Sequence, residues 1–132
     1  MIHRALKIGR WNIEFIFAGK RYDVDEIARC LYDAGASSFV LEQAEDLMWI
    51  CDYNCGFTFT NPRRHKAVVV IGPTTSGAEF QDTFVHEIHH LAVAIAAELG
   101  IDLESETPAY IAGDSARELA EVLCEMGCTH CH

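Results

Sequence analysis

The chain has 132 residues, half of them hydrophobic, and a formal net charge of −10 from 10 Lys and Arg against 20 Asp and Glu. This length fits a single domain over residues 1–132, and the hydrophobic content excludes an intrinsically disordered chain. The acidic balance and the lack of a basic block argue against nucleic acid or an anionic membrane as the main partner, because both attract a cationic surface.

The sequence carries no secretory signal and no segment long enough to span a bilayer. Residues 1–11 mix apolar side chains with Arg and Lys and contain no cleavage pattern. The longest apolar stretch, residues 91–99, is too short to cross a membrane and contains Glu98. We therefore expect a soluble, cytoplasmic protein whose six cysteines are reduced thiols or metal ligands rather than disulfides.

The first third of the chain predicts one strand and two helices. Residues 11–18 favour a strand. Asp23 or Asp25 caps a helix that stops at Gly35, and a second helix covers residues 38–50. The residues predicted to face the core are Ile27, Leu31 and Tyr32 in the first helix and Leu41, Ala44, Leu47 and Met48 in the second.

A hairpin is predicted next, followed by a long helix. Residues 56–60 alternate at period two, and the continuous apolar run 67–71 indicates a strand covered on both faces. Ser76 and Glu79 form a capping box for a helix that stops at Gly100. Because nearly every residue after His90 in this helix is apolar, we expect the helix to be buried. Its predicted core stripe consists of Phe80, Phe84, Ile88, Leu91, Ile95 and Leu99.

The long helix contains the pattern H-E-x-x-H at residues 86–90. His86 and His90 lie one helical turn apart on the same face, so both imidazoles can reach one zinc ion. Glu87 is rotated away from the metal ligands and is placed to act as the general base. Buried imidazoles need partners, and a metal ion would supply one.

Two alternatives to this assignment remain open. The helix can carry three histidines that are satisfied without a metal. His86 and His89 can also form an i, i+3 pair, although that pairing leaves Glu87 without its usual role. We prefer His86 with His90 and place His89 beside the site.

A catalytic zinc site usually has a third protein ligand, which we expect from the last predicted helix. That helix begins at Ser105 or Thr107 and ends near Met126. Glu106 is the preferred ligand, with Asp102 and Glu104 as competitors.

The last predicted helix also carries polar residues at helical spacing that suggest supporting roles. These are Glu106, Tyr110, Gly113, Asp114 and Arg117. Tyr110 would donate a hydrogen bond to an oxyanion, and Asp114 would orient the outer nitrogen of a histidine. Gly113 would allow two helices to approach closely. The alternatives are a core aromatic for Tyr110 and an ordinary ion pair between Asp114 and Arg117.

With these segments, the sequence resembles the zincin metallopeptidases, and in particular the gluzincin branch that includes thermolysin. The resemblance rests on residues 86–90 and on residues 106–109, which fit the E-x-x-A/D pattern of that branch. It implies zinc held by His86, His90 and Glu106, Glu87 as the base, and a substrate cleft lined by an edge strand at residues 67–71. The chain is also similar to small phage- or prophage-associated proteins of gut bacteria.

The sequence departs from the gluzincin pattern in three respects. Only fifteen residues separate His90 from Glu106, and Tyr110 stands where thermolysin-like enzymes carry Asp. The chain is also short, so the resemblance covers the minimal core at residues 56–125.

The cysteines suggest a second, weaker metal hypothesis. Cys124, Cys128 and Cys131 crowd the end of the chain, and Cys51 and Cys55 form a pair upstream. Four thiolates in two such pairs would hold a structural zinc. Incidental thiols near a frayed terminus are the alternative.

The sequence therefore predicts an α+β, zincin-like domain in which a small mixed sheet packs against helices and the H-E-x-x-H helix is buried. The preferred function is a zinc-dependent hydrolase that cuts peptides or proteins. A binding protein that keeps zinc for structure or regulation is the main alternative, and a nucleic-acid module built on the Cys/His tail is a weaker one.

Overall fold

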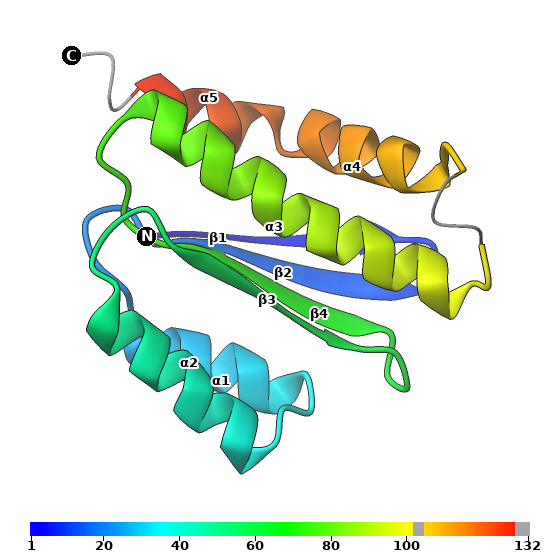
Figure 1. Cartoon of the computed structure of the whole chain (residues 1–132), viewed down its shortest axis with the longest axis horizontal. Helices are drawn as coiled ribbons and strands as arrows, with labels where there is room; N and C mark the ends of the chain where they lie inside the picture. The colour runs from blue at the N-terminus through cyan, green and yellow to red at the C-terminus, as the bar shows by residue number, and fades with distance from the viewer. Residues whose placement is uncertain (102–104, 129–132) are drawn as a thin grey trace.

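A computed structural model of the chain describes residues 1–101 and 105–128, which form one mixed sheet and five helices (Figure 1). The strands are β1 (Ile2–Ile8), β2 (Trp11–Phe17), β3 (Gly56–Asn61) and β4 (Lys66–Ile71). The helices are α1 (Val24–Asp33), α2 (Ser38–Ile50), α3 (Gly77–Glu98), α4 (Thr107–Glu118) and α5 (Ala120–Cys128). No helix in these ranges is long and apolar enough to cross a membrane.

The sheet has the strand order β1-β2-β4-β3. β1 pairs antiparallel with β2, β2 pairs parallel with β4, and β3 pairs antiparallel with β4. The predicted α+β class with a small mixed sheet is confirmed. The expectation that residues 67–71 form the edge strand is wrong, because β4 lies between β2 and β3, and β3 is the edge strand on that side.

Helices cover both faces of the sheet (Figure 1). α1 and α2 pack on one face, and α3 lies across the other with α4 and α5 beside it. β4 confirms the prediction from its continuous apolar run: Val69 and Ile71 join the core under α3, whereas Val68 and Val70 join the core under α1 and α2.

The sequence analysis missed β1. Ile2, Leu6 and Ile8 pack against the core under α3, while the intervening positions carry His3 and Lys7 on the other face. Charged residues interrupt the alternation, so its apolar period is hard to recognise. Gly9, with φ of 57°, opens the tight turn between β1 and β2, and only glycine adopts this backbone conformation readily.

The end of the chain forms two helices rather than the single one predicted. α4 begins at Thr107 with Pro108 in its first turn, as expected, but Leu119 departs from helical geometry with φ of −100° and ψ of 11°. α5 then continues to Cys128. The break lets Leu119 and Val122 both enter the core under α3.

Two predicted core residues are exposed. Tyr32 follows Leu31 by one residue, which rotates it about 100° away from the buried face of α1. Leu99 is the C-cap of α3, where the chain leaves the helix. The rest of the predicted α3 stripe is buried, namely Phe80, Phe84, Ile88, Leu91 and Ile95.

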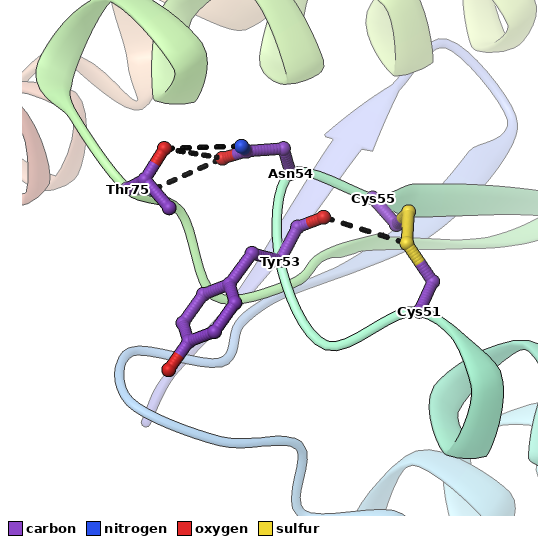
Figure 2. The surroundings of a disulfide bond; sticks show 5 residues. All are labelled: Cys51, Tyr53, Asn54, Cys55 and Thr75. Atoms are coloured by element: carbon purple, nitrogen blue, oxygen red, sulfur yellow. Dashed lines mark hydrogen bonds between the residues drawn. A yellow bond between two sulfur atoms is a disulfide. The ribbon is translucent and has the colours of Figure 1, made fainter.

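The expectation of six reduced cysteines is also wrong, because Cys51 and Cys55 are joined by a disulfide (Figure 2). This bond closes the loop between α2 and β3. In the same loop, Asn54 exchanges hydrogen bonds with Thr75: the Thr75 amide donates to Asn54 Oδ1 at 3.0 Å, and Asn54 Nδ2 donates to Thr75 Oγ1 at 3.0 Å. The start of β3 is thereby fixed to the segment that leads into α3.

Candidate metal centre on helix α3

The H-E-x-x-H pattern lies in the middle of α3, as predicted, and its first and last residues converge. His86 Nε2 and His90 Nε2 are 3.2 Å apart. The two rings meet edge to face, with centroids 4.8 Å apart. Both imidazoles are exposed and α3 is buried along only part of its surface, so the expectation of a buried H-E-x-x-H helix is not confirmed.

The histidine pair opens onto a cavity of about 410 Å³ beside the edge strand β3. The cavity is lined by Gly56, Phe57, Thr58, Thr60, His86, Glu87 and His90. β3 alternates in the expected way: Phe57 and Phe59 pack towards α1 and α2, which leaves Thr58 and Thr60 on the side of α3. The cavity is therefore polar on both the helix side and the strand side.

Glu87 is the buried member of the pattern, with only 4% of its surface exposed. The Thr58 hydroxyl donates to Glu87 Oε1 at 2.9 Å and also lies 3.2 Å from the Glu87 carbonyl oxygen. A buried carboxylate requires such a partner, and this one holds its orientation. The side chain is therefore fixed at the floor of the cavity, next to the two imidazoles.

Gly56 allows α3 to approach the start of β3 closely. A Cβ atom at this position would lie 2.6 Å from the Val70 carbonyl oxygen and 3.1 Å from both Glu87 Cγ and Thr83 Cγ2. Any larger residue would push the strand away from Glu87. At the N-terminus of α3, Ser76 caps the helix by accepting a hydrogen bond from the Glu79 amide, as the capping box predicts.

The separation of the two imidazole nitrogens fits zinc. Two nitrogens at about 2.05 Å from a tetrahedral zinc ion lie about 3.3 Å from each other. An N–H···N hydrogen bond between a neutral donor and acceptor pair of imidazoles also spans a comparable distance. The donor set and its spacing therefore suit zinc.

Glu106 does not join the histidine pair in the structure. It precedes α4, which contacts α3 and β1, whereas the histidines face β3 at the opposite edge of the sheet. Within the described ranges, His86, His90 and Glu106 do not form a group in which one ligand atom from each lies within 4.8 Å of the others. Glu106 instead accepts a hydrogen bond from the Tyr110 hydroxyl at 3.2 Å.

The other predicted supporting residues are also away from the cavity. Tyr110 is exposed, and Asp114 forms an ion pair with Arg117 at 2.9 Å, which is the alternative that the sequence left open. A Cβ at Gly113 would meet open space, so this glycine does not serve a close helix contact. His89 is exposed, with its ring centroid 6.3 Å from that of His90.

Several predicted ligands cannot join the proposed sites or are not described. Asp102, Glu104, Cys131 and the side chain of Cys128 lie outside the described residues. Cys124 is exposed on α5. The disulfide engages the sulfur atoms of Cys51 and Cys55, so in this state they do not provide the thiolates that the second-zinc hypothesis requires.

Thr58 and Gly56 are the site residues that the sequence analysis did not identify. The period-two pattern of residues 56–60 predicted the strand, and it also places the glycine and the threonines on the face opposite Phe57 and Phe59. The sequence could not indicate that α3 covers this face.

No protein-family model, curated protein or solved structure matches the chain.

Proposed function

We propose that this protein is a zinc-dependent hydrolase that acts on peptide bonds, with His86 and His90 as metal ligands and Glu87 as the general base. The observation that carries the proposal is the convergence of the two Nε2 atoms at 3.2 Å beside the buried Glu87 carboxylate. This arrangement fits both the metal and the base of a hydrolytic site.

A bound zinc ion would supply Lewis acidity, which polarises a substrate carbonyl and lowers the pKa of water towards neutrality. The remaining work falls to the protein. Thr58 occupies Glu87 Oε1, so we assign Oε2 to accept the proton from the attacking water and to return it to the leaving amine. His86 and His90 line the cavity between α3 and β3, so the reaction would take place on that side of α3.

The position of the cavity favours an extended peptide or protein segment as substrate. β3 is one of the two edge strands of the sheet, and its residues that face α3 line the cavity, namely Gly56, Thr58 and Thr60. The backbone groups on the outer side of an edge strand can pair with another extended chain. The cavity opens next to this strand, so a bound segment would run past Glu87.

A second candidate is a zinc centre that serves structure or regulation and does not catalyse a reaction. Such a centre has no open coordination position, so further protein groups, for example the neighbouring His89, would have to close it. Glu106 as a third ligand rests on the resemblance to gluzincins and would require α4 to leave its place against α3 and β1.

Metal analysis and peptide turnover test these two candidates together. We expect the purified protein to bind zinc at a site that His86→Gln with His90→Gln removes. We expect Glu87→Gln to keep the zinc and lose hydrolysis of a mixed peptide library. Zinc binding without turnover in the parent protein would favour the non-catalytic candidate. If the double variant binds zinc as the parent does, the metal centre on α3 is wrong.

A further inference from the structure

A second group of metal-type ligands lies on the other face of the sheet, between β1 and α1. His3 comes from β1, and Glu26 and Cys30 come from successive turns of α1. Within the described ranges, these three residues form the one group in which a ligand atom from each lies within 4.8 Å of the others. Nothing in the zincin resemblance involves this region.

The distances within the group are close to those of a tetrahedral metal site. Cys30 Sγ lies 3.9 Å from His3 Nε2 and 3.9 Å from Glu26 Oε1. His3 Nδ1 lies 3.3 Å from Glu26 Oε1. Ligand atoms around one zinc ion are separated by about 3.3–3.6 Å, as the bond lengths to nitrogen, oxygen and sulfur require. The distances from Cys30 Sγ exceed this separation by a few tenths of an ångström. His3 faces Cys30 with Nε2 and Glu26 with Nδ1, so its ring would also have to turn to direct one nitrogen at the ion.

We propose that His3, Glu26 and Cys30 form a second cation site, selective for zinc-like divalent ions, that ties β1 to α1. The combination of imidazole, carboxylate and thiolate suits zinc and excludes calcium or magnesium, which prefer oxygen ligands alone.

Glu14, from the neighbouring strand β2, is the nearest candidate for the fourth position. Its Oε2 lies 2.5 Å from His3 Nε2. In the described structure it is not within 4.8 Å of all three ligand atoms, so its side chain would have to move from its hydrogen bond with His3 to become a ligand. The site would then be closed by four protein groups, as structural zinc sites are.

The surrounding charges favour a cation in spite of Arg29. Arg29 donates to both carboxylate oxygens of Glu26 and also pairs with Asp33. The carboxylates of Glu14, Glu26 and Asp33 therefore outnumber the single guanidinium. Arg29 Nη2 also lies 3.8 Å from Cys30 Sγ, so the guanidinium would have to withdraw from the thiolate when an ion binds, and its ion pair with Asp33 can hold it there.

The group is accessible from solvent. A cavity of about 350 Å³ beside it is lined in part by Glu14, Arg29, Cys30 and Asp33. His3 and Glu26 are each about a quarter exposed, at 26% of their side-chain surface. An ion can therefore reach the site in the folded protein without opening the core.

The competing explanation is a hydrogen-bonded network in which His3 bridges Glu14 and Glu26 and Cys30 remains a thiol. Cobalt distinguishes the two arrangements, because only a thiolate bound to Co²⁺ gives an intense near-ultraviolet charge-transfer band. The titration uses the full chain with the Cys51–Cys55 disulfide intact and with His86→Gln and His90→Gln in place, so that the α3 histidines do not bind the ion.

We expect one Co²⁺ per chain and a thiolate band that persists when Cys124, Cys128 and Cys131 are all replaced by Ser and disappears when Cys30→Ser is added to these replacements. Zinc should then displace the cobalt and raise the Tm, and Cys30→Ser should abolish the rise. Far-ultraviolet circular dichroism checks that Cys30→Ser is folded. If it is not, Glu26→Gln, at a partly exposed position, should weaken cobalt binding at least tenfold.

The absence of a thiolate band, or a band that remains in folded Cys30→Ser, would overturn the proposal. An undiminished cobalt affinity in Glu26→Gln would also overturn it. Because both α3 histidines are replaced in this experiment, its outcome does not depend on the proposed hydrolase.

Discussion

The two groups of metal-type ligands lie on opposite faces of the sheet and are assembled in different ways. His86 and His90 are one turn apart on α3 beside the edge strand β3. His3 and Cys30 are 27 residues apart and meet only because α1 packs on the face of the sheet to which His3 points. The first group faces an open cavity and adjoins a buried carboxylate, as a reactive site requires, whereas the second has ligand groups on several sides, as a structural site requires.

The largest expected difference between the two regions is in turnover. Glu87→Gln removes the proposed base, and loss of general-base catalysis should lower kcat about 10²–10⁴-fold. Glu26→Gln removes a carboxylate from the other group and should leave kcat unchanged. Steady-state hydrolysis of a peptide substrate by both zinc-loaded variants measures the contrast. Equal loss in the two variants would contradict the assignment of chemistry to α3.

A smaller effect is expected on stability where α3 meets β3. Gly56→Ala places a Cβ 2.6 Å from the Val70 carbonyl oxygen and should lower the free energy of unfolding by about 1–3 kcal/mol. Gly113→Ala is the matched control. Gly113 is an interior residue of α4, and a Cβ added there would have no neighbouring atom within 4 Å, so the change should raise the free energy of unfolding by up to about 1 kcal/mol. Urea unfolding measures both. If Gly56→Ala is as stable as Gly113→Ala, the close packing at the site is wrong.

Thr58→Val tests how far Glu87 depends on its hydrogen bond. A hydrogen bond to a charged group contributes about 1.5–3 kcal/mol, so its loss should reduce kcat by roughly tenfold or more with little change in KM. Thr60→Val changes another threonine that lines the cavity and should have a weaker effect. A rise in KM with kcat unchanged would indicate that Thr58 contacts the substrate and does not position Glu87.

The smallest expected effect concerns Glu106. Because α4 lies against α3 and β1, away from the histidine pair, Glu106→Gln should leave the zinc affinity of the α3 site unchanged. His86→Gln in parallel should weaken it strongly. Competition with a chromophoric chelator gives both affinities. A comparable loss in Glu106→Gln would show that α4 moves and that Glu106 is the third ligand of gluzincins.

Cys30 gives a further contrast within the second region. Burial raises the pKa of its thiol to about 11, so the metal-free protein carries little thiolate at pH 8. We expect iodoacetamide to modify Cys30 much more slowly than the exposed Cys124, as peptide mass mapping over time would record. Equal rates would show that α1 opens readily from the sheet.

The features that the sequence predicted correctly are local ones. The capping box at Ser76, the covered strand β4 and the helical spacing of His86 and His90 each depend on residues within a few positions of one another. Such patterns are set by backbone geometry and can be recognised without knowing the fold.

The features that it missed depend on contacts between distant segments. Thr58 reaches Glu87 across 29 residues, and the cluster of His3 with Cys30 requires β1, whose charged residues concealed its alternation. Glu106 shows the same dependence: its place in a short pattern predicts a ligand, whereas in the structure α4 packs on the β1 side, away from the cavity that the histidine pair lines. Local spacing alone does not determine which side of α3 a later helix occupies.

Zinc-soaked crystals, measured at the zinc absorption edge, test the central claim most directly. The account predicts an anomalous peak about 2.0–2.1 Å from both His86 Nε2 and His90 Nε2, on the side that faces Glu87 and β3. Imidazoles that remain hydrogen-bonded to each other, with no peak between them in zinc-soaked crystals, would contradict it.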